Sequence, residues 1–286
     1  MNLSNKNYLF IVGQPKAGTS SLFKWLLKHP DICGSSLKEA RFFLDHSYPL
    51  ERPFVYDGSN LDEYMRFFEK PDNSVLMDAT PDYLYNQNAL EASEKLPNAR
   101  AVVILRDPIE RVVSAFRFFK QSGRIPSDMT LSDYVLFQDQ NKVTSQTPVQ
   151  FRALDHCRTD VYLERWKAAY GDRLLVLDFE VLKKDPHRCV DTVTRFLGLK
   201  DVAIDRQSLG VENRTKVARS QSLSRTYNVV RRKLSQKMIM FPAIKKKLKP
   251  FSVFLRSFIY KELVGSASEI DAKTAEIIKS WSEAQA

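Results

Sequence analysis

A short apolar run followed by a glycine-containing loop, near the N-terminus, constrains the fold of this chain more than any other feature. Residues 8–12 (YLFIV) are continuously apolar, as is typical of a buried strand, and Gly13 and Pro15 end the run. From 18 to 29 apolar residues recur at helical spacing, and Pro30 ends the predicted helix. A strand, a tight loop and a helix in this order predict the first unit of an α/β domain.

Strands and helices are predicted to alternate from there as far as residue 197. Apolar runs predict further strands over 75–77, 101–105 and 174–177. Helical spacing predicts helices over 61–69, 161–170 and 187–197, one that begins at Pro108, and a short one over 131–137. We therefore expect an α/β, P-loop-like three-layer fold, in which a central, mainly parallel sheet is flanked by helices.

Positive charge is concentrated in one C-terminal segment. The net charge is +10, yet 14 lysines and arginines and no acidic residue lie between Asn213 and Lys261, while the rest of the chain carries 30 basic and 34 acidic residues. We expect a basic helical extension over 221–286, packed on an α/β domain formed by 1–220. Its charge indicates either a solvated face or an anionic partner, namely a glycan or, through 225–261, an anionic membrane surface. No nucleic-acid reading motif accompanies it.

The cysteines and the N-terminus indicate a cytoplasmic protein. If the segment 225–261 contacts a membrane, we expect the protein to be bound peripherally at its surface. The three cysteines are far apart and have no C-x-x-C spacing, so they are expected to be buried free thiols. The first apolar run is too short for a signal peptide, and no run approaches the ~20 apolar residues of a membrane helix. The histidines form no metal-binding motif.

The loop between the first strand and the first helix, 13–21 (GQPKAGTSS), is predicted to bind a phosphate group. The spacing of Gly13 and Gly18 matches a P-loop, but Thr19 stands where a nucleoside triphosphatase has its lysine, and Lys16 comes earlier. Backbone amides at such a helix N-terminus converge on an anion, and the loop hydroxyls add donors. The alternative is an ordinary turn whose lysine is solvated.

A second loop repeats this arrangement. Arg106 follows the strand that ends at Leu105, and Ser114 lies about two helical turns later. An arginine fork and a hydroxyl can bind a second phosphate. The alternative makes Arg106 a surface ion-pair partner and Ser114 a small residue at a packing contact.

Four motifs together resemble a known family. Residues 14–21 (QPKAGTSS) and 106–116 (RDPIERVVSAF) resemble the two nucleotide signatures of sulfotransferases that use 3′-phosphoadenosine 5′-phosphosulfate (PAPS). Residues 38–43 (KEARFF) resemble the Lys-Glu-x-x-Phe-Phe segment of heparan sulfate and related glycan sulfotransferases, and 78–83 (DATPDY) are similar to the Thr/Ser-Pro-x-Tyr segment that follows it. In this family the first loop holds the 5′-phosphosulfate, and the arginine and serine of the second hold the 3′-phosphate.

The resemblance implies PAPS as donor, 3′-phosphoadenosine 5′-phosphate (PAP) as product, and no metal. It implies Glu39 as the catalytic base, Lys16 as the group that stabilises the leaving oxygen, and Lys38 as a second catalytic cation. The donor-binding residues that it implies are Gln14, Pro15, Lys16, Ala17, Gly18, Thr19, Ser20, Ser21, Arg106, Ser114, Lys216 and Arg219.

The expected function is sulfuryl transfer by in-line displacement to a hydroxyl, with an amine ranked second, of a saccharide, glycolipid or other small-molecule acceptor, including one linked to a lipid. His46 is a rival base, and Glu39 is alternatively a surface carboxylate paired with Lys38 or Arg41. Ala79 stands where glycan enzymes often carry a basic residue, so no acceptor-binding residues are transferred from them. The alternative functions are a P-loop nucleotide kinase or triphosphatase and a non-enzymatic anion-binding scaffold.

Overall fold

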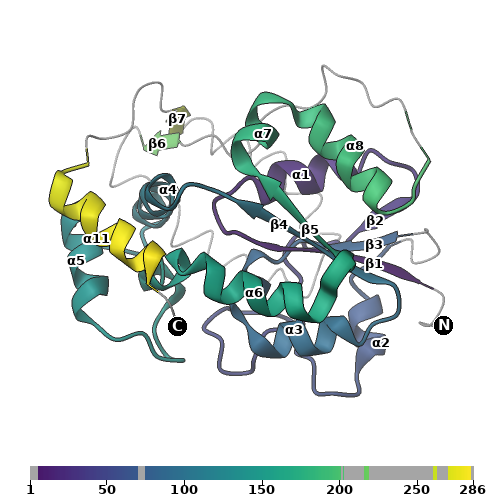
Figure 1. The fold of residues 1–286 in the computed structure, drawn as a ribbon. Coiled ribbons are helices and arrows are strands. Elements are labelled where there is room, and N and C mark those ends of the chain that lie inside the picture. Colours follow the sequence, from purple (N-terminus) through teal and green to yellow (C-terminus); the bar gives the residue numbers. More distant parts are fainter. Residues whose placement is uncertain are drawn as a thin grey trace.

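A five-stranded parallel sheet forms the centre of the molecule (Figure 1). The computed structural model describes residues 6–69, 75–200, 202, 216–218, 260–262 and 270–284. The strand order is β2-β3-β1-β4-β5, and the strands are β1 (Asn7–Gly13), β2 (Ile32–Gly34), β3 (Val75–Asp78), β4 (Ala99–Leu105) and β5 (Leu174–Asp178). All four pairings are parallel, which confirms the predicted α/β, P-loop-like fold.

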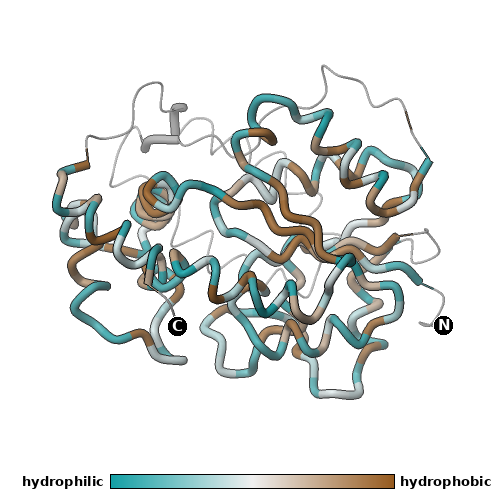
Figure 2. Tube along the Cα trace, viewed as in Figure 1, coloured by the Kyte–Doolittle hydropathy of each residue, from teal (hydrophilic) through white to brown (hydrophobic). Residues whose placement is uncertain are grey.

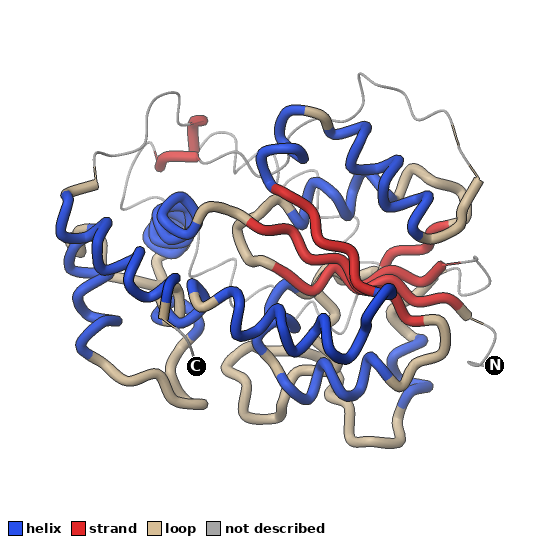
Figure 3. Tube along the Cα trace, in the orientation of Figure 1, coloured by secondary structure: helices blue, strands red, loops and turns tan. Residues whose placement is uncertain are grey.

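Helices cover both faces of this sheet (Figures 1 and 3). One face packs against α1 (Thr19–Leu26), α7 (Phe179–Lys184) and α8 (Pro186–Phe196). The other packs against α2 (Leu61–Met65), α3 (Gln87–Glu94) and α6 (Thr159–Tyr170). Because side chains alternate along a strand, Leu9 and Ile11 of β1 pack on the face covered by α1, α7 and α8, and Phe10 packs on the opposite face. Both faces are buried, and the strands are therefore almost continuously apolar (Figure 2).

A third apolar cluster lies beside the sheet, between α4 (Pro108–Gln121), α5 (Leu131–Gln140) and α11 (Ala272–Glu283). Ile278 of α11 is fully buried there, and the Trp281 indole N–H donates to Asp139 at 2.8 Å. The C-terminal helix therefore packs on the α/β unit. The proposed boundary at residue 220 and the segment 221–259 lie outside the described residues, so their assignment stays a prediction.

The remaining described elements are short. The 3₁₀ helices are η2 (Pro81–Tyr85), η3 (Val149–Phe151), η4 (Asp155–Cys157) and η5 (Gly171–Arg173), and a small antiparallel pair joins β6 (Lys216–Ala218) to β7 (Tyr260–Glu262). The three cysteines are buried and free, as predicted.

Several element boundaries differ from the sequence-based prediction. The first helix ends at Leu26 rather than at 29, because His29 turns inward, where its Nε2 lies 3.1 Å from the Lys200 carbonyl oxygen. The helix predicted over 61–69 ends at Met65. β2, α3 and α7 were not predicted, and α11 lies within the helical extension expected over 221–286, although its bounds were not predicted. β2 has only three residues, and α3 is fixed by a polar cap, in which Asn86 accepts a hydrogen bond from the Ala89 amide at 2.9 Å.

The strand order places the motif-bearing loops next to one another. β1 lies between β3 and β4, and all three strands run in the same direction. The loops that follow them therefore leave the same edge of the sheet. In parallel α/β sheets this carboxyl edge is where ligands bind.

Candidate active site

The loop between β1 and α1 has the backbone that an anion site needs. Lys16 (φ 72°) and Gly18 (φ 85°) are both left-handed. The left-handed conformation of Gly18 favours glycine, and a β-carbon there would lie 2.9 Å from the end of the Leu182 side chain, which would have to shift. Gly18 caps α1 with no side-chain hydrogen bond, so no side chain caps the first amides of this helix, the groups that bind anions at a helix N-terminus.

Gln14 joins the two predicted phosphate loops. Its side chain is 1% exposed; the amide oxygen accepts from the Arg106 backbone N–H at 3.0 Å, and the amide nitrogen donates to the Thr159 hydroxyl at 2.6 Å. The Gln14 backbone N–H donates to the Ile104 carbonyl at 3.0 Å. The Gln14 side chain thus holds both loops against the start of α6, and its predicted contact with the donor stays a prediction.

Arg106 also connects the loops. Its guanidinium donates to the Lys16 carbonyl at 2.8 Å and pairs with Glu110 at 3.0 Å, while it lies over the Phe179 ring, 4.3 Å from the ring centre. The ion pair foreseen as the alternative for Arg106 is therefore present. The guanidinium nonetheless remains 17% exposed beside the first loop, where it can exchange Glu110 for a phosphate group.

Lys16 occupies the position where the motifs meet. Its ammonium lies 4.1 Å from the centre of the Phe118 ring. Burial lowers the pKa of Lys16 to about 8; the positive charges of Arg106 and Lys38 act in the same direction, and the negative charge of Glu39 partly opposes them. The fold thus brings residues from two other motifs within electrostatic reach of Lys16.

The other predicted donor-binding residues differ in exposure. Ala17, Thr19 and Ser21 are buried, whereas Pro15 and Ser20 are half-buried. Ser114 is half-buried on α4, and its hydroxyl has no hydrogen-bond partner among the described residues. For Lys216 only the backbone, in β6, is described, and Arg219 lies outside the described residues.

Glu39 is held between two cations. Its carboxylate lies 3.3 Å from the Lys38 ammonium and 2.7 Å from the Arg41 guanidinium, and its side chain is 30% exposed. Burial alone would raise the pKa of Glu39, but the charges and hydrogen bonds of Lys38 and Arg41 outweigh it, so that the pKa is lowered. Glu39 is therefore ionised at neutral pH and able to accept a proton. His46 is exposed, and no contact joins its side chain to these residues in the described part of the chain.

Two buried carboxylates beneath Glu39 were not assigned a role from the sequence. Asp78, at the end of β3, is fully buried; burial raises its pKa to about 6, and hydrogen bonds from Thr80 and Tyr83 limit the rise. Asp82 accepts from the Tyr48 hydroxyl at 2.8 Å, and burial likewise raises its pKa. The only signal in the sequence is an acidic residue directly after an apolar strand, within the motif 78–83.

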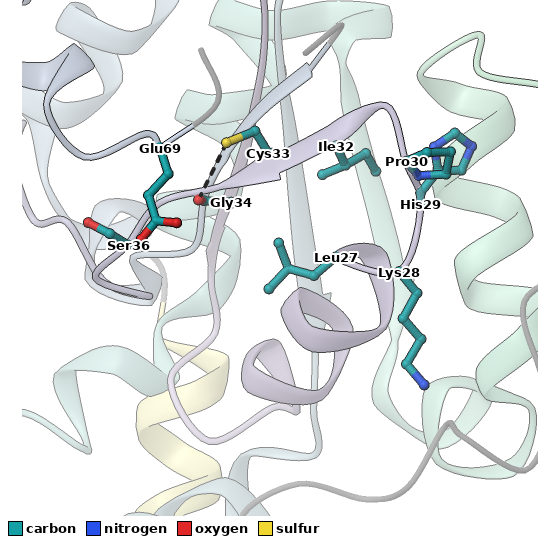
Figure 4. Close-up of a pocket in the computed structure, with 9 residues that line it drawn as sticks. All are labelled: Leu27, Lys28, His29, Pro30, Ile32, Cys33, Gly34, Ser36 and Glu69. Carbon is teal, nitrogen blue, oxygen red and sulfur yellow. Dashed lines mark hydrogen bonds between the residues drawn. The ribbon is translucent and has the colours of Figure 1, made fainter. Parts of the chain in front are cut away.

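A hollow of about 390 Å³ lies at the edge strand β2 (Figure 4). Its walls are formed by Leu27, Lys28, His29, Pro30, Ile32, Cys33, Gly34, Ser36 and Glu69, none of which is a predicted site residue. Within the described ranges no helix is long and apolar enough to cross a membrane, and no group of three or more His, Cys, Asp or Glu side chains could hold a metal ion.

Comparison with known proteins identifies the family. The sulfotransferase domain model matches residues 6–238. Human bifunctional heparan sulfate N-deacetylase/N-sulfotransferase 1 is 29% identical over 211 residues, and the human form 2 is 27% identical over 209. These alignments cover 67% and 66% of this chain and 22% of each relative, so the chain spans about a fifth of their length. A sulfotransferase from Alicyclobacillus acidocaldarius has a TM-score of 0.59 and 25% identity, covering 72% of this chain and 87% of that one.

The family model covers the phosphate loops, the Glu39 segment and the strands that carry them, in the order in which the sequence predicted them. The match confirms the predicted resemblance and supports sulfuryl transfer over the kinase alternative. The chain belongs to the sulfotransferase domain family.

Proposed function

We propose that this protein transfers a sulfuryl group from PAPS to a hydroxyl of a saccharide acceptor. The observation that carries this proposal is the convergence of Lys16, Arg106 and Glu39, which come from three distant motifs, at the carboxyl edge of one parallel sheet. This constellation brings a candidate base within electrostatic reach of Lys16, one of the two cations assigned to the nucleotide.

The side chains present fit such a donor. The N-terminus of α1, which has no side-chain cap, and Lys16 form one anion-binding position. Arg106 forms a second with the Ser114 hydroxyl, for which the described residues supply no hydrogen-bond partner. Both positions offer N–H and O–H donors, as phosphate and sulfonate oxygens require. The buried Thr19 stands directly after Gly18, where a triphosphatase has its lysine. These features favour a phosphosulfate over a nucleoside triphosphate.

In the proposed reaction the sulfur–oxygen bond to the donor phosphate breaks as a bond from sulfur to the acceptor oxygen forms. PAPS supplies the sulfuryl group when bound. The Glu39 carboxylate accepts the acceptor's hydroxyl proton, and the Lys16 ammonium donates a hydrogen bond to the oxygen that leaves. Lys38 stabilises sulfonate charge, while Arg106 and Ser114 hold the 3′-phosphate and align the nucleotide.

Replacing Arg106 with alanine should weaken PAP binding by about 1.5–3 kcal/mol, the usual scale for a hydrogen bond to a charged group. The loss has two sources, because Arg106 also holds the Lys16 carbonyl. Isothermal calorimetry with PAP measures the change. Arg100→Ala, at the opposite end of the same strand β4, is the matched control and should bind PAP like the wild type. Equal PAP affinity in the Arg106→Ala variant and the wild type would remove Arg106 from the 3′-phosphate site.

Donor binding should weaken as the pH rises through about 8. The pKa of Lys16 is lowered from its ordinary 10.5 to about 8, so the free protein loses this cation above pH 8. A bound phosphate group favours the charged lysine, so binding at that pH takes up a proton. Calorimetry with PAP in buffers of different ionisation enthalpy measures the uptake. Lys16→Arg, which keeps its charge, should bind without it. Proton uptake that persists in that variant would assign the titration to another group.

The acceptor that we propose is a saccharide. The relatives named above are heparan sulfate N-deacetylase/N-sulfotransferases, which supports a saccharide and makes an amine the second candidate for the sulfated group. The test is a screen of glycans, aminoglycans and glycolipids with ³⁵S-labelled PAPS, followed by mass spectrometry of the product. Absence of label transfer to every acceptor, together with absence of PAP binding, would reject the function.

We also propose a cytoplasmic enzyme whose basic segment 225–261 contacts an anionic membrane surface or a lipid-linked acceptor. The support is the acid-free stretch of the sequence, which has more cations than one nucleotide needs. This segment lies almost wholly outside the described residues. Sedimentation with vesicles that contain anionic lipid, at low and high salt, tests the contact.

A further inference from the structure

The segment that carries Glu39 contains no helix or strand of its own. Ser35 to Phe43 is irregular in the structure, and Arg41 within it has a left-handed backbone (φ 59°), which residues with a side chain seldom adopt. A general base has to be held within a fraction of an ångström of its productive position. Contacts with residues outside this segment must therefore hold Glu39 in position.

The fixing bonds come from β3 and the residues that follow it. The Ala40 N–H donates to Asp78 Oδ1 at 3.4 Å, and on the other side of Glu39 the Ala79 N–H donates to the Lys38 carbonyl at 3.2 Å. Both flanks of Glu39 are thus bonded to consecutive residues at the end of one sheet strand.

Asp78 extends this hold through two hydroxyl groups. The Thr80 hydroxyl donates to Asp78 Oδ1 at 2.8 Å and accepts the Arg41 N–H at 3.1 Å. The Tyr83 hydroxyl donates to Asp78 Oδ2 at 2.9 Å and accepts the Phe43 N–H at 3.3 Å. One fully buried carboxylate therefore orients the hydroxyls that receive two amides of the segment, in addition to accepting a third amide directly.

We propose that Asp78, acting through Thr80 and Tyr83, is the positioning residue that fixes the Glu39 segment against the donor loop. This inference rests on the proposed function, in which Glu39 is the base. Asp78 does not touch the reacting groups in this arrangement. Its role is to hold the backbone of 40–43, and with it the Arg41 guanidinium that contacts Glu39 at 2.7 Å.

The structure supplies matched pairs of variants for the test. Tyr83→Phe and Tyr64→Phe each remove one tyrosine hydroxyl that donates to Asp78 Oδ2, but only Tyr83 also receives an amide of the segment. Thr80→Val removes the other relay, whereas Thr80→Ser keeps its hydroxyl. These variants keep the Asp78 carboxylate in place, so the test survives if Asp78→Asn fails to fold.

Thr80→Val and Tyr83→Phe should lower kcat by about 10- to 100-fold, which is the loss of rate expected when a catalytic base is displaced by up to about 1 Å. The affinity for PAP should not change. Hydrogen exchange in the 40–43 amides should quicken in both variants. The acid limb of the kcat profile should move to higher pH in Thr80→Val, since a looser Arg41 stabilises the Glu39 carboxylate less. Thr80→Ser and Tyr64→Phe should match the wild type.

Wild-type exchange and kcat in both Thr80→Val and Tyr83→Phe would overturn the inference. A loss of PAP affinity that parallels the loss of kcat would also overturn it, because Asp78 would then support the whole domain. If the wild type binds no PAP and transfers no sulfuryl group, the proposed function fails, and the exchange data still decide whether Asp78 fixes this segment.

Discussion

Replacing Glu39 with glutamine is expected to lower kcat by about 10²–10⁴-fold, the range that general acid–base catalysis contributes. The glutamine keeps the size of the side chain, and its single amide oxygen can still accept a hydrogen bond from Lys38 or from Arg41, though not from both. It is too weak a base to take the acceptor's proton. Because Glu39 faces the acceptor rather than the nucleotide in the proposed mechanism, the affinity for PAP should change little. Steady-state turnover and calorimetry on the same preparation separate these two effects.

Two variants sharpen this experiment. Glu91→Gln, on the exposed surface of α3, makes the same chemical change away from the site and should turn over like the wild type. Glu39→Asp keeps the carboxylate but shortens its reach, so its kcat should fall between those of the wild type and the glutamine variant. If Glu39→Gln retains wild-type turnover, Glu39 is the surface ion-pair partner that its contacts with Lys38 and Arg41 would also allow.

The sheet could be predicted because it is buried on both faces. A strand such as β4 (Ala99–Leu105) must then be apolar at almost every position, and this pattern is readable without a partner strand. β2 is only three residues long, and the cap of α3 depends on one asparagine. The sequence pattern of either element therefore cannot be distinguished from that of a loop. Patterns of burial predict the layers of a fold better than its short edge elements.

The two loops predicted to bind phosphate could be located for a related reason, since each directly follows an apolar strand. That they bind phosphate stays a prediction. What the sequence could not show is how these loops are connected to one another. The Gln14 amide joins residues 92 and 145 positions away in the chain, and the Asp78 carboxylate holds a segment 38 positions earlier. Such contacts depend on the three-dimensional packing of strands, and a single sequence carries no local signal for them.

Lys16→Ala should produce the second large effect, a loss of about 10²–10³-fold in kcat, the scale measured when one donor to a developing negative charge is removed. Unlike the Glu39→Gln variant, it should also weaken PAP binding, because Lys16 belongs to the donor loop. The combination follows from its location: the ammonium lies beside Arg106 and Lys38 in a partly buried site, where each charge is screened little by water.

Single-turnover kinetics with pre-bound PAPS separate the two contributions of Lys16, because saturation with donor removes the binding defect and leaves the loss of leaving-group stabilisation. Lys24→Ala, an exposed lysine on the adjoining helix α1, is the matched control and should retain wild-type kinetics. Lys16→Arg should recover PAP affinity more fully than rate, since a planar guanidinium restores the charge but not the position of a single compact donor. If the Lys16→Ala protein loses affinity for PAP but reacts at the wild-type rate once saturated with donor, Lys16 acts in donor binding only. Lys38 would then be the residue that stabilises the leaving oxygen.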